Sequence, residues 1–370
     1  MGSCNDEALI TDAPSHYDRL SMRLGDHTTL RLGGDAREVV VATTREQLVD
    51  AVTSADAAGT PVLVLGGGSN LVVGDEGFDG RVVLVQTRGI EADDGVHAAE
   101  LRVEAGEPWD ALVAECVSRG LSGVECLSGI PGLVGATPLQ NVGAYGQEVQ
   151  GTIASVTVYD RQERRLRMLS NTECAFSYRT SALKDAAPRY VVIDVRFRLE
   201  RNPESAPIRY AELARALSIE EGHRAPLALV RDTVIALRRS KGMVSDPSDP
   251  DSVSAGSFFM NPTLDAEALA ALDARVSTHL GEGVRAPRFP SDRGKTKVAA
   301  AWLIERAGFK KGHGTGRVRI SNKHALALVN RGGGTTHELL ALAREIRDGV
   351  RAAFGVTLEV EPQMVGCRLD

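Results

Sequence analysis

A single serine stands between a glycine and two phenylalanines in the segment GSFFMNP, residues 256–262. A serine hydroxyl is a very weak acid, so Ser257 would protonate carbon only over a short distance and in a place kept free of water. The rings of Phe258 and Phe259 would provide that exclusion. The alternative is a buried loop whose hydroxyl bonds the backbone, and the segment taken alone favours this second interpretation.

A run of glycines suggests an anion site in the segment GGGSN, residues 66–70, which follows an apolar run and leads into LVV. The letters do not fit GxGxxG, and a strand pattern follows where a helix would be needed, so an ordinary Rossmann site is disfavoured. Backbone N–H groups without side chains in the way, with Ser69 and Asn70 as further donors, would suit a pyrophosphate. A tight turn between two strands would also explain part of the pattern.

A second glycine-rich segment, SGIPGLVGATPLQNVGAYGQE at 128–148, favours the binding interpretation. It holds too many apolar residues for a solvent-exposed linker. A packed backbone loop that lies close against a large planar ligand needs this mixture of glycine and apolar side chains. We therefore expect both glycine-rich segments to face one ligand.

The first half of the chain must position these segments, and its patterns predict an α+β unit. Thr44 and Gln47 form a capping-box pair that begins a helix, and Gly59 ends it. Apolar spacing predicts further helices around 109–117 and over 226–241, and 120–147 is rich in loops. Strands are expected at 61–65, 71–73, 82–87, 101–106, 153–160 and 190–199.

The second half of the chain predicts a smaller α/β lobe. The segment KGMVSDPSDPDSVSAG, residues 241–256, is typical of a connection between lobes because it is rich in proline, serine and aspartate. Helices are expected over 264–280, 296–307 and 335–354, and strands over 325–330 and 356–361.

Composition excludes several classes of protein. The 370 residues carry a net charge of -6, which favours a soluble protein and argues against non-specific binding of nucleic acid. We expect neither a membrane span nor a signal peptide, hence a cytoplasmic location. The five cysteines show no CxxC or Cys/His spacing, so we expect neither a disulfide framework nor a metal site. Cys116 is expected to be a small core residue.

Seven motifs stand in the order found in the UDP-N-acetylenolpyruvoylglucosamine reductase (MurB) family, which the chain resembles from TTLRLGG at 28–34 to residue 362. The motifs are GGGSN, SGIPGLVGATPLQNVGAYG, YRTS at 178–181, GSFFMNP, WLIERAGF at 302–309, SNKHALALVN at 321–330 and LEVEP at 358–362.

The resemblance implies a fold and a reaction. The fold is α+β, with a two-subdomain FAD-binding unit of the vanillyl-alcohol-oxidase (PCMH) type and a smaller α/β substrate-binding domain. We expect an N-terminal extension at 1–25, the FAD-binding unit at 26–242, the substrate domain at 243–362 and a C-terminal tail at 363–370. The implied reaction is the NADPH-dependent reduction of an enolpyruvyl ether to a lactyl ether, giving UDP-N-acetylmuramate for peptidoglycan, with non-covalent FAD. We expect a monomer.

The reaction needs a hydride at the β carbon, stabilisation of the resulting enolate, and a proton at the α carbon. By resemblance, Arg179 in YRTS stabilises the enolate and Ser257 is the proton donor. Glu361 is the third catalytic candidate, chosen over Glu359 because the family spacing runs from Leu358. A carboxylate beside a substrate carboxylate would be repelled unless protonated or paired with Arg179, which predicts a raised pKa.

The resemblance also implies binding residues. Met260 stands where the family often has lysine, and His324 stands where some members have glutamine. The implied substrate-binding residues are Tyr178, Tyr210, Arg238, Lys241, Gly256, Asn261 and His324, with Arg238 and Lys241 facing the diphosphate and Tyr210 closing over it. The implied FAD-binding residues are Gly66, Gly67, Gly68, Ser69, Asn70, Leu71, Ser128, Gly129, Ile130, Pro131, Gly132, Gly135, Ala136, Thr137, Gln140, Asn141, Gly143, Ala144, Tyr145 and Arg179.

Three other functions fit the sequence less well. A flavin oxidase of the same fold would share the glycine loops, but it would have no reason to keep GSFF, YRTS and LEVE together, and no histidine stands in those loops for covalent flavin attachment. A sugar-nucleotide-binding regulator is disfavoured by the intact Ser257, Arg179 and Glu361. A hydrolase is disfavoured because no GxSxG motif occurs.

Overall fold

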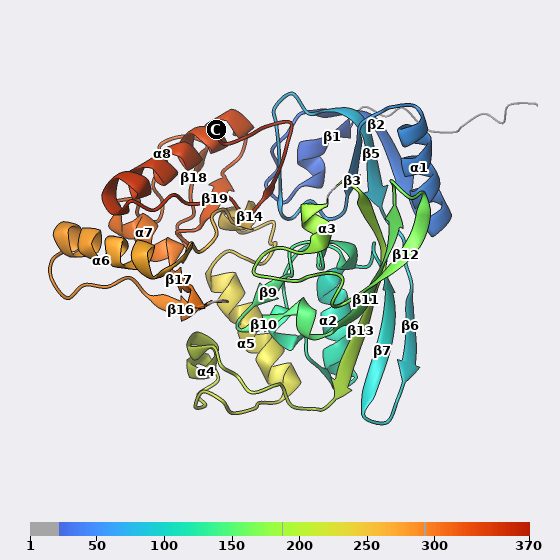
Figure 1. Ribbon diagram of the computed structural model, residues 1–370, viewed down its shortest axis with the longest axis horizontal. Helices are drawn as coiled ribbons and strands as arrows, with labels where there is room; N and C mark the ends of the chain where they lie inside the picture. The colour runs from blue at the N-terminus through green and yellow to red at the C-terminus, as the bar shows by residue number, and fades with distance from the viewer. Residues whose placement is uncertain (1–21, 187, 292–293) are drawn as a thin grey trace, which may run out of the picture.

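The computed structural model describes residues 22–186, 188–291 and 294–370. Figure 1 shows a larger unit built on two sheets and, beside it, a smaller lobe formed by the C-terminal helices α6, α7 and α8. In the described ranges, no helix combines the length and the apolar character needed to cross a membrane.

The first sheet of the larger unit has the strand order β1-β2-β5-β3, in which β5 pairs in parallel with both β2 and β3. Helix α1 begins at the predicted cap, where Thr44 accepts a hydrogen bond from the Gln47 N–H, and Gly59 follows with a positive φ. The elements are β1 (Met22–Arg23), β2 (Asp35–Ala42), α1 (Arg45–Ala57), β3 (Val62–Leu65), β4 (Leu71–Val73) and β5 (Phe78–Val85).

The second sheet is antiparallel, with the order β12-β11-β13-β7-β6, and β8 pairs with β13. Its inner face packs with α1 and α2 into one core that includes Cys116, as expected for that cysteine. The elements are β6 (Ile90–Asp94), β7 (Ala98–Glu104), α2 (Trp109–Ser118), β8 (Leu121–Ser122), β9 (Gly143–Ala144), β10 (Gln147–Glu148), β11 (Ile153–Asp160), β12 (Arg165–Ser170), α3 (Ala182–Asp185), β13 (Tyr190–Arg201), α4 (Ala211–Ala216) and α5 (Leu227–Ser240).

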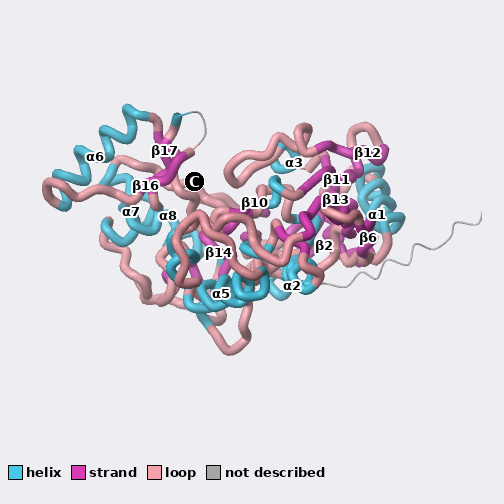
Figure 2. Tube along the Cα trace, turned by 90° about the horizontal axis from the view of Figure 1, so that it is seen from below, coloured by secondary structure: helices cyan, strands magenta, loops and turns pink. Residues whose placement is uncertain are grey.

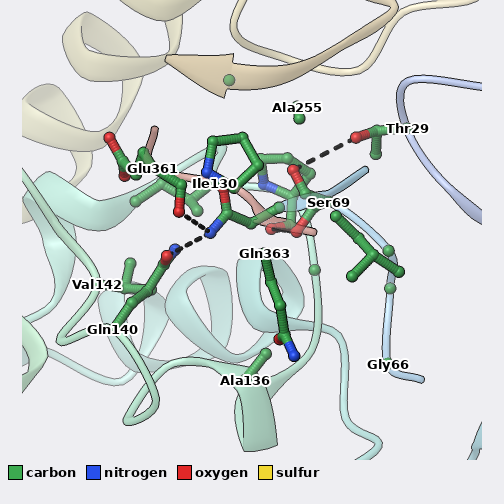
Figure 3. A pocket seen from close by; sticks show the side chains of 18 of the residues that line it. Thr29, Gly66, Ser69, Ile130, Ala136, Gln140, Val142, Ala255, Glu361 and Gln363 are labelled. Carbon is green, nitrogen blue, oxygen red and sulfur yellow. Dashed lines mark hydrogen bonds between the residues drawn. The ribbon is translucent and has the colours of Figure 1, made fainter. Parts of the chain in front are cut away.

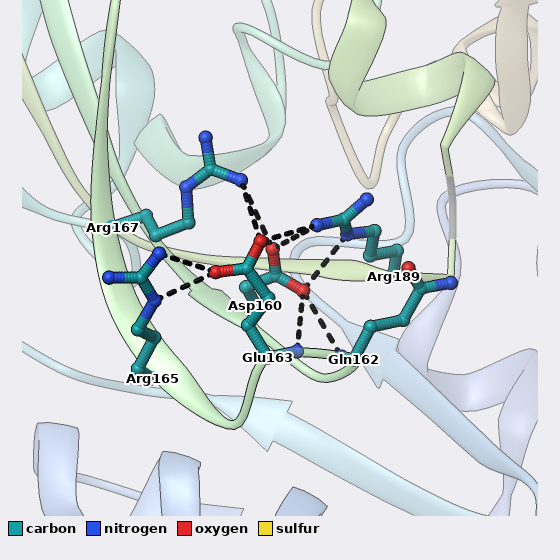
Figure 4. A network of polar contacts seen from close by, with 6 residues as sticks. All are labelled: Asp160, Gln162, Glu163, Arg165, Arg167 and Arg189. Carbon is teal, nitrogen blue, oxygen red and sulfur yellow. Dashed lines mark hydrogen bonds and ion pairs between the residues drawn. The ribbon is translucent and has the colours of Figure 1, made fainter.

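A buried carboxylate fixes the turn between β11 and β12 (Figure 4). Asp160 accepts hydrogen bonds from the N–H groups of Gln162 and Glu163 at 3.1 and 3.2 Å, and from Arg189 at 2.9 and 2.5 Å. Arg167 pairs with it at 3.3 Å. The Arg189 bonds, chiefly, hold the pKa of Asp160 well below its usual range despite burial. The Asp160 carboxylate therefore holds the β11–β12 hairpin against Arg189, which directly precedes β13.

The smaller lobe holds two three-stranded antiparallel sheets, β14-β19-β18 and β15-β17-β16, covered by three helices. Figure 2 shows this lobe set to one side of the larger unit. Its elements are β14 (Ser254–Ser257), β15 (Thr263–Leu264), α6 (Ala266–Leu280), β16 (Arg288–Pro290), β17 (Thr296–Val298), α7 (Ala300–Arg306), β18 (Val318–Ile320), β19 (Ala327–Asn330) and α8 (Thr336–Phe354).

The two parts exchange segments at the chain ends. Strand β20 (Gln363–Val365) pairs in parallel with β4, so part of the predicted C-terminal tail, 363–370, lies in a sheet of the larger unit. Conversely, Leu30 and Leu32 belong to the core of the C-terminal lobe. Residues 22–25 of the predicted extension form β1 and the start of a 3-10 helix with a buried Leu24, while residues 1–21 lie outside the described residues.

Two predicted elements are wrong in part. The helix expected over 296–307 is a strand, β17, at its start, because residues 296–298 pair with both β15 and β16. The strand expected over 356–361 is an extended segment with one isolated bridge, between Phe259 and Val360. The alternation of Val356, Leu358 and Val360 reflects one face turned to the lobe core, without a continuous partner strand.

Candidate active site

A cavity of about 550 Å³ lies where the larger unit, the interlobe connection and the C-terminal segment meet. Figure 3 shows Gly66, Ile130, Gln140, Ala255 and Glu361 around it, although they come from distant parts of the chain. Both glycine-rich segments line the cavity, as the sequence predicts, and β14 and residues 360–363 line it from other sides.

The first glycine loop has no room for side chains. A Cβ built on Gly67 would lie 2.8 Å from the Gly132 Cα, and one built on Gly68 would lie 2.1 Å from the His27 carbonyl oxygen. Gly68 also has a φ of +57°. The Ser69 hydroxyl donates to the Pro131 carbonyl at 3.0 Å. The two glycine loops are therefore held against each other by backbone contact.

The N–H groups of residues 67–69 have no backbone acceptor within the described part of the chain. Asn70 is held by its side-chain amide, which donates to the Gln140 side chain and, at 3.4 Å, to the Glu361 carbonyl oxygen. Unpaired N–H groups in a loop without side chains form a concave donor surface that fits a pyrophosphate. This geometry favours the binding interpretation of GGGSN over a simple turn.

Arg179 stands at the tip of a tight turn whose ends, Ser177 and Thr180, exchange backbone hydrogen bonds at 3.1 and 3.2 Å. Its φ of 58° is unusual for a residue with a side chain. The guanidinium Nε lies 3.1 Å from Glu361 Oε1, but this buried nitrogen has no hydrogen-bond partner within the described residues. The arginine thus faces the cavity with donors to spare.

Glu361 combines burial with a charged neighbour. Burial raises the pKa of its carboxyl above the ordinary value, and the charges of Arg179 and Lys184 oppose that rise only in part. The raised pKa agrees with the prediction for this residue. Glu359, the rejected candidate, is exposed, whereas Glu361 lines the cavity.

Ser257 is the last residue of β14 and lines the same cavity. The residue after it, Phe258, donates its N–H to the Leu326 carbonyl at 2.8 Å and accepts from the Glu361 N–H at 2.9 Å. Phe258 and Phe259 are 1% exposed, with ring centroids 5.1 Å apart. Within the described residues no hydrogen bond to the Ser257 hydroxyl is found. The alternative interpretation, a buried loop in which the Ser257 hydroxyl bonds the backbone, therefore finds no such hydrogen bond in the described structure.

Arg238, predicted to face a substrate diphosphate, lines the cavity beside the glycine loops. Its Nη2 donates to the Met243 carbonyl at 2.8 Å, while its buried Nε has no partner among the described residues. Burial lowers the pKa of Arg238 to about 10, so the guanidinium keeps its charge at neutral pH. A positive charge is therefore present inside the cavity.

Other predicted substrate residues gather next to the cavity. Lys241 Nζ lies 2.6 Å from Glu212 and 5.5 Å from the Tyr145 ring centroid, and the Tyr145 and Tyr210 rings meet edge to face at 5.4 Å. The pKa of His324 is lowered to about 4, chiefly by burial and then by the charge of Lys241. Together these residues form a cationic and aromatic cluster of suitable composition for a phosphorylated ligand.

Tyr178 and Asn261 do not line the main cavity, although the Arg179 Cζ lies 5.7 Å from the Tyr178 ring centroid. Burial raises the pKa of Tyr178, and the charge of Arg179, followed by hydrogen bonds with Asn261, partly opposes that rise. Asn261 also accepts the Ala300 N–H at 2.9 Å. Tyr178 instead lines a second cavity, of about 310 Å³, where Lys297 Nζ lies 4.3 Å from its ring centroid.

The predicted FAD-binding residues divide into two groups. Some residues of the second loop do not line the cavity and use their side chains for bonds to other parts of the protein: Ser128 donates to the Glu125 carbonyl at 2.6 Å, and Asn141 donates to Glu148 and the Ser177 carbonyl at 2.9 and 3.2 Å. Gly129, Gly135, Ala144 and Tyr145 also lie outside the lining. The residues that line the cavity are Gly66, Gly67, Gly68, Ser69, Asn70, Leu71, Ile130, Pro131, Gly132, Ala136, Thr137, Gln140, Gly143 and Arg179.

Sequence reasoning missed several lining residues. The Thr29 hydroxyl donates to the Ser254 carbonyl at 2.7 Å and the Ser69 carbonyl at 3.4 Å, and thus joins the first glycine loop to β14. Thr29 belongs to TTLRLGG, so the motif order carried a signal for it. The other lining residues that were not predicted include Leu63, Val64, Leu65, Trp109, Leu133, Leu139, Val142, Lys184, Gly242, Met243, Ser245, Ser252, Ser254, Ala255, Val360, Pro362 and Gln363.

Comparison with known proteins gives consistent matches along the chain. Residues 247–365 match the UDP-N-acetylenolpyruvoylglucosamine reductase C-terminal domain family, and residues 36–168 match a family described as FAD binding domain. A protein of Thermobifida fusca named UDP-N-acetylenolpyruvoylglucosamine reductase is 57% identical over 349 residues, which cover 94% of this chain and 97% of that protein.

Two further relatives extend the comparison. A protein of the same name from Streptomyces coelicolor is 56% identical over 343 residues, covering 92% of this chain and 88% of that protein. The crystal structure of the reductase from Thermus caldophilus matches with a TM-score of 0.63 at 27% identity and covers 94% of this chain and 98% of that one.

Proposed function

The chain belongs to the UDP-N-acetylenolpyruvoylglucosamine reductase family, and from that premise we propose how its residues carry out the reaction. It is a flavin-dependent oxidoreductase that uses FAD and NADPH to reduce UDP-N-acetylglucosamine enolpyruvate in peptidoglycan synthesis. The observation that carries the residue assignment is the convergence of Ser257, Arg179 and Glu361 on the cavity lined by both glycine loops.

The cavity residues fit FAD. Among the described residues the N–H groups of 67–69 have no acceptor, and they form a cradle for the diphosphate; a side chain added at Gly67 or Gly68 would collide with the backbone of Gly132 or His27 and displace this loop. Ile130, Leu133 and Val142 supply apolar wall for a planar ring system. When bound, the flavin supplies hydride chemistry, which no amino-acid side chain provides.

Arg179 provides the positive charge for the enolate. Its guanidinium faces the cavity, and its buried Nε has an unused donor. Negative charge develops on the substrate carboxylate during reduction, and preorganised donors stabilise a transition state more than they stabilise the ground state. Glu361 lies 3.1 Å from the Arg179 Nε and holds the arginine in place, and burial raises the pKa of its carboxyl.

Ser257 donates the proton to carbon. Phe258 and Phe259 anchor the end of β14 in the lobe core and keep water from that side. The hydroxyl is free of intramolecular bonds to described residues, so its proton is available for transfer. The segment 258–261 also fixes Ser257 relative to Glu361 through the Phe258 carbonyl and the Glu361 N–H.

We further propose that Lys241, Tyr210 and His324 receive the nucleotide part of the substrate beside the cavity. Lys241 would exchange its contact with Glu212 for the diphosphate, and Tyr210, which is 37% exposed, would close over it. We also propose a monomer that acts in the cytoplasm, where peptidoglycan precursors are made, and the division at residues 242/243 remains our proposed lobe boundary.

The two half-reactions test the proposal. The purified protein should carry a flavin absorbance that NADPH bleaches without oxygen and that UDP-N-acetylglucosamine enolpyruvate restores, and mass spectrometry should show that the product has gained two hydrogen atoms. A reduced protein that oxygen reoxidises but the enolpyruvyl compound does not would instead indicate another flavin oxidoreductase of this fold. A protein that binds the substrate but no flavin would contradict both.

A further inference from the structure

Arg179 adopts a backbone conformation that its own side chain disfavours. Its φ of 58° lies in the left-handed region, which residues with a Cβ rarely occupy. Such a conformation persists only where surrounding contacts hold it. One of the turn bonds holds the N–H of the peptide after Arg179, which Thr180 donates to the Ser177 carbonyl, but neither turn bond holds the carbonyl oxygen of Arg179.

Lys184 is in contact with that peptide. Its Nζ donates to the Arg179 carbonyl oxygen at 3.1 Å from the short helix α3. Ser181 anchors the start of that helix, because its hydroxyl donates to the Leu139 carbonyl at 2.8 Å and accepts from the Lys184 N–H. The second glycine loop thus supports α3, and α3 supports the carbonyl of Arg179.

Lys184 also lines the cavity, and its charge acts on Glu361. Two explanations of a functional effect therefore exist: Lys184 holds the Arg179 backbone, or its ammonium group acts directly on the substrate. The hydrogen bond to the Arg179 carbonyl occupies one of the three donors of the ammonium group and restricts where Nζ lies. That restriction favours the first explanation.

We propose that Lys184 is a positioning residue for Arg179. By binding the carbonyl of a left-handed residue, it acts together with the Thr180 N–H bond to Ser177 to keep the peptide plane in the orientation that turns the guanidinium toward Glu361 and the cavity. This inference rests on the proposed function, since it concerns the geometry of the arginine that stabilises the enolate.

A double-mutant cycle on the two half-reactions tests the inference. Lys184→Met removes the donor and keeps most of the apolar stem, and Arg179→Lys keeps the charge but shortens the reach. In the wild-type background, Lys184→Met should slow flavin reoxidation by the enolpyruvyl substrate at least about fivefold, with flavin content and reduction by NADPH unchanged. In the Arg179→Lys background the same change should have less than about a twofold effect, because the geometry it protects is already lost.

Matched variants complete the design. Asp185→Asn lies on the same short helix, where among the described residues its carboxylate accepts a hydrogen bond from the Thr180 hydroxyl alone, at 2.9 Å, and it should leave both half-reactions near normal. Lys184→Arg should recover part of the rate, since a guanidinium also donates to a carbonyl. Equal slowing by Lys184→Met in both backgrounds, or normal reoxidation in Lys184→Met, would overturn the inference. Failure of the wild type to reoxidise with the substrate would instead reject the proposed function.

Discussion

The Nε of Arg179 lies 3.1 Å from Oε1 of Glu361 without forming a hydrogen bond. The contact joins a turn of the larger unit to the extended segment that follows the C-terminal lobe. Because charge attraction holds the pair while a donor stays unused, the arginine is oriented and still able to bind another carboxylate. A bidentate hydrogen-bonded pair would have left fewer donors of the guanidinium for a substrate.

The raised pKa of Glu361 predicts how its removal changes stability with pH. A folded-state pKa above the unfolded value of 4.5 means that the folded protein binds the proton more tightly. The stability that this carboxyl contributes is then complete below about pH 4.5 and is lost as pH rises through the folded pKa. Urea titrations of the flavin-free protein measure this effect. As pH rises from about 4.5 through the folded pKa, the wild type should lose stability relative to Glu361→Gln, so the free energy of unfolding of the variant minus that of the wild type should increase. A pH-independent difference would show that the pKa is ordinary.

Ser257→Ala should separate the half-reactions. Only reoxidation by the enolpyruvyl substrate needs a proton on carbon, so it should slow by about 10²-fold to 10⁴-fold, while reduction by NADPH stays near normal. Flavin content should also stay intact. Stopped-flow absorbance measures both steps, and Ser257→Cys should recover part of the rate because a thiol also donates. If both half-reactions of the alanine variant ran at normal speed, Ser257 would be a structural residue.

Gly68→Ala should impair FAD retention. The new Cβ would lie 2.1 Å from the His27 carbonyl oxygen, at a φ of +57°, so the loop must shift, and we expect a loss of about 1 to 3 kcal/mol in the free energy of unfolding. The flavin-to-protein absorbance ratio after gel filtration should fall with it. Gly151→Ala is the control, since a Cβ there would meet nothing within 4 Å. Equal flavin retention in both variants would remove the first loop from the site.

His324→Gln should make the protein less sensitive to mild acid. Burial, chiefly, lowers the pKa of His324 to about 4, and the Leu326 N–H donates to its Nδ1 at 3.1 Å. The unfolded chain therefore binds the proton first, and the stability that the neutral ring contributes is present above about pH 6.5 and lost as pH falls toward 4. Urea midpoints of wild type and variant should converge over this range. Parallel curves would place the ring in contact with water.

Asp160→Asn should destabilise the larger unit by about 1.5 to 3 kcal/mol, because a buried charge with two arginine partners becomes a neutral amide. Because the pKa of Asp160 is lowered in the folded protein, the difference in the free energy of unfolding between wild type and variant should shrink as pH falls below about 3.8. Urea unfolding monitored by circular dichroism measures both effects. Glu163→Gln is the control in the same network, and its exposed pairs should contribute less than about 1 kcal/mol. Similar losses in the two variants would contradict the assignment.

Local sequence predicted local structure well and long-range pairing poorly. The Thr44 cap and Gly59 marked α1 because capping depends on neighbouring residues. The helix pattern over 296–307 does not show that residues 296–298 are a strand, because one of their two partners, β15, is separated from them by the whole of helix α6. At the site, motif order led to the glycine loops, Ser257, Arg179 and Glu361. It did not separate cavity-lining residues such as Gln140 from Asn141, whose amide bonds within the loop, since that depends on where each side chain points.

Because strand β20 lies near the C-terminus, the cavity is completed only late in the synthesis of the chain. The chain passes through the whole C-terminal lobe before Gln363 pairs with β4, donates to the Asn70 carbonyl at 3.0 Å and completes the cavity wall. Domains emerging from the ribosome generally fold from the N-terminus onward, so the larger unit can collapse first with one wall of its cavity absent. Capture of the flavin therefore follows synthesis of the last lobe, and a nascent chain stalled before residue 363 should bind flavin weakly even though both glycine loops have already been made.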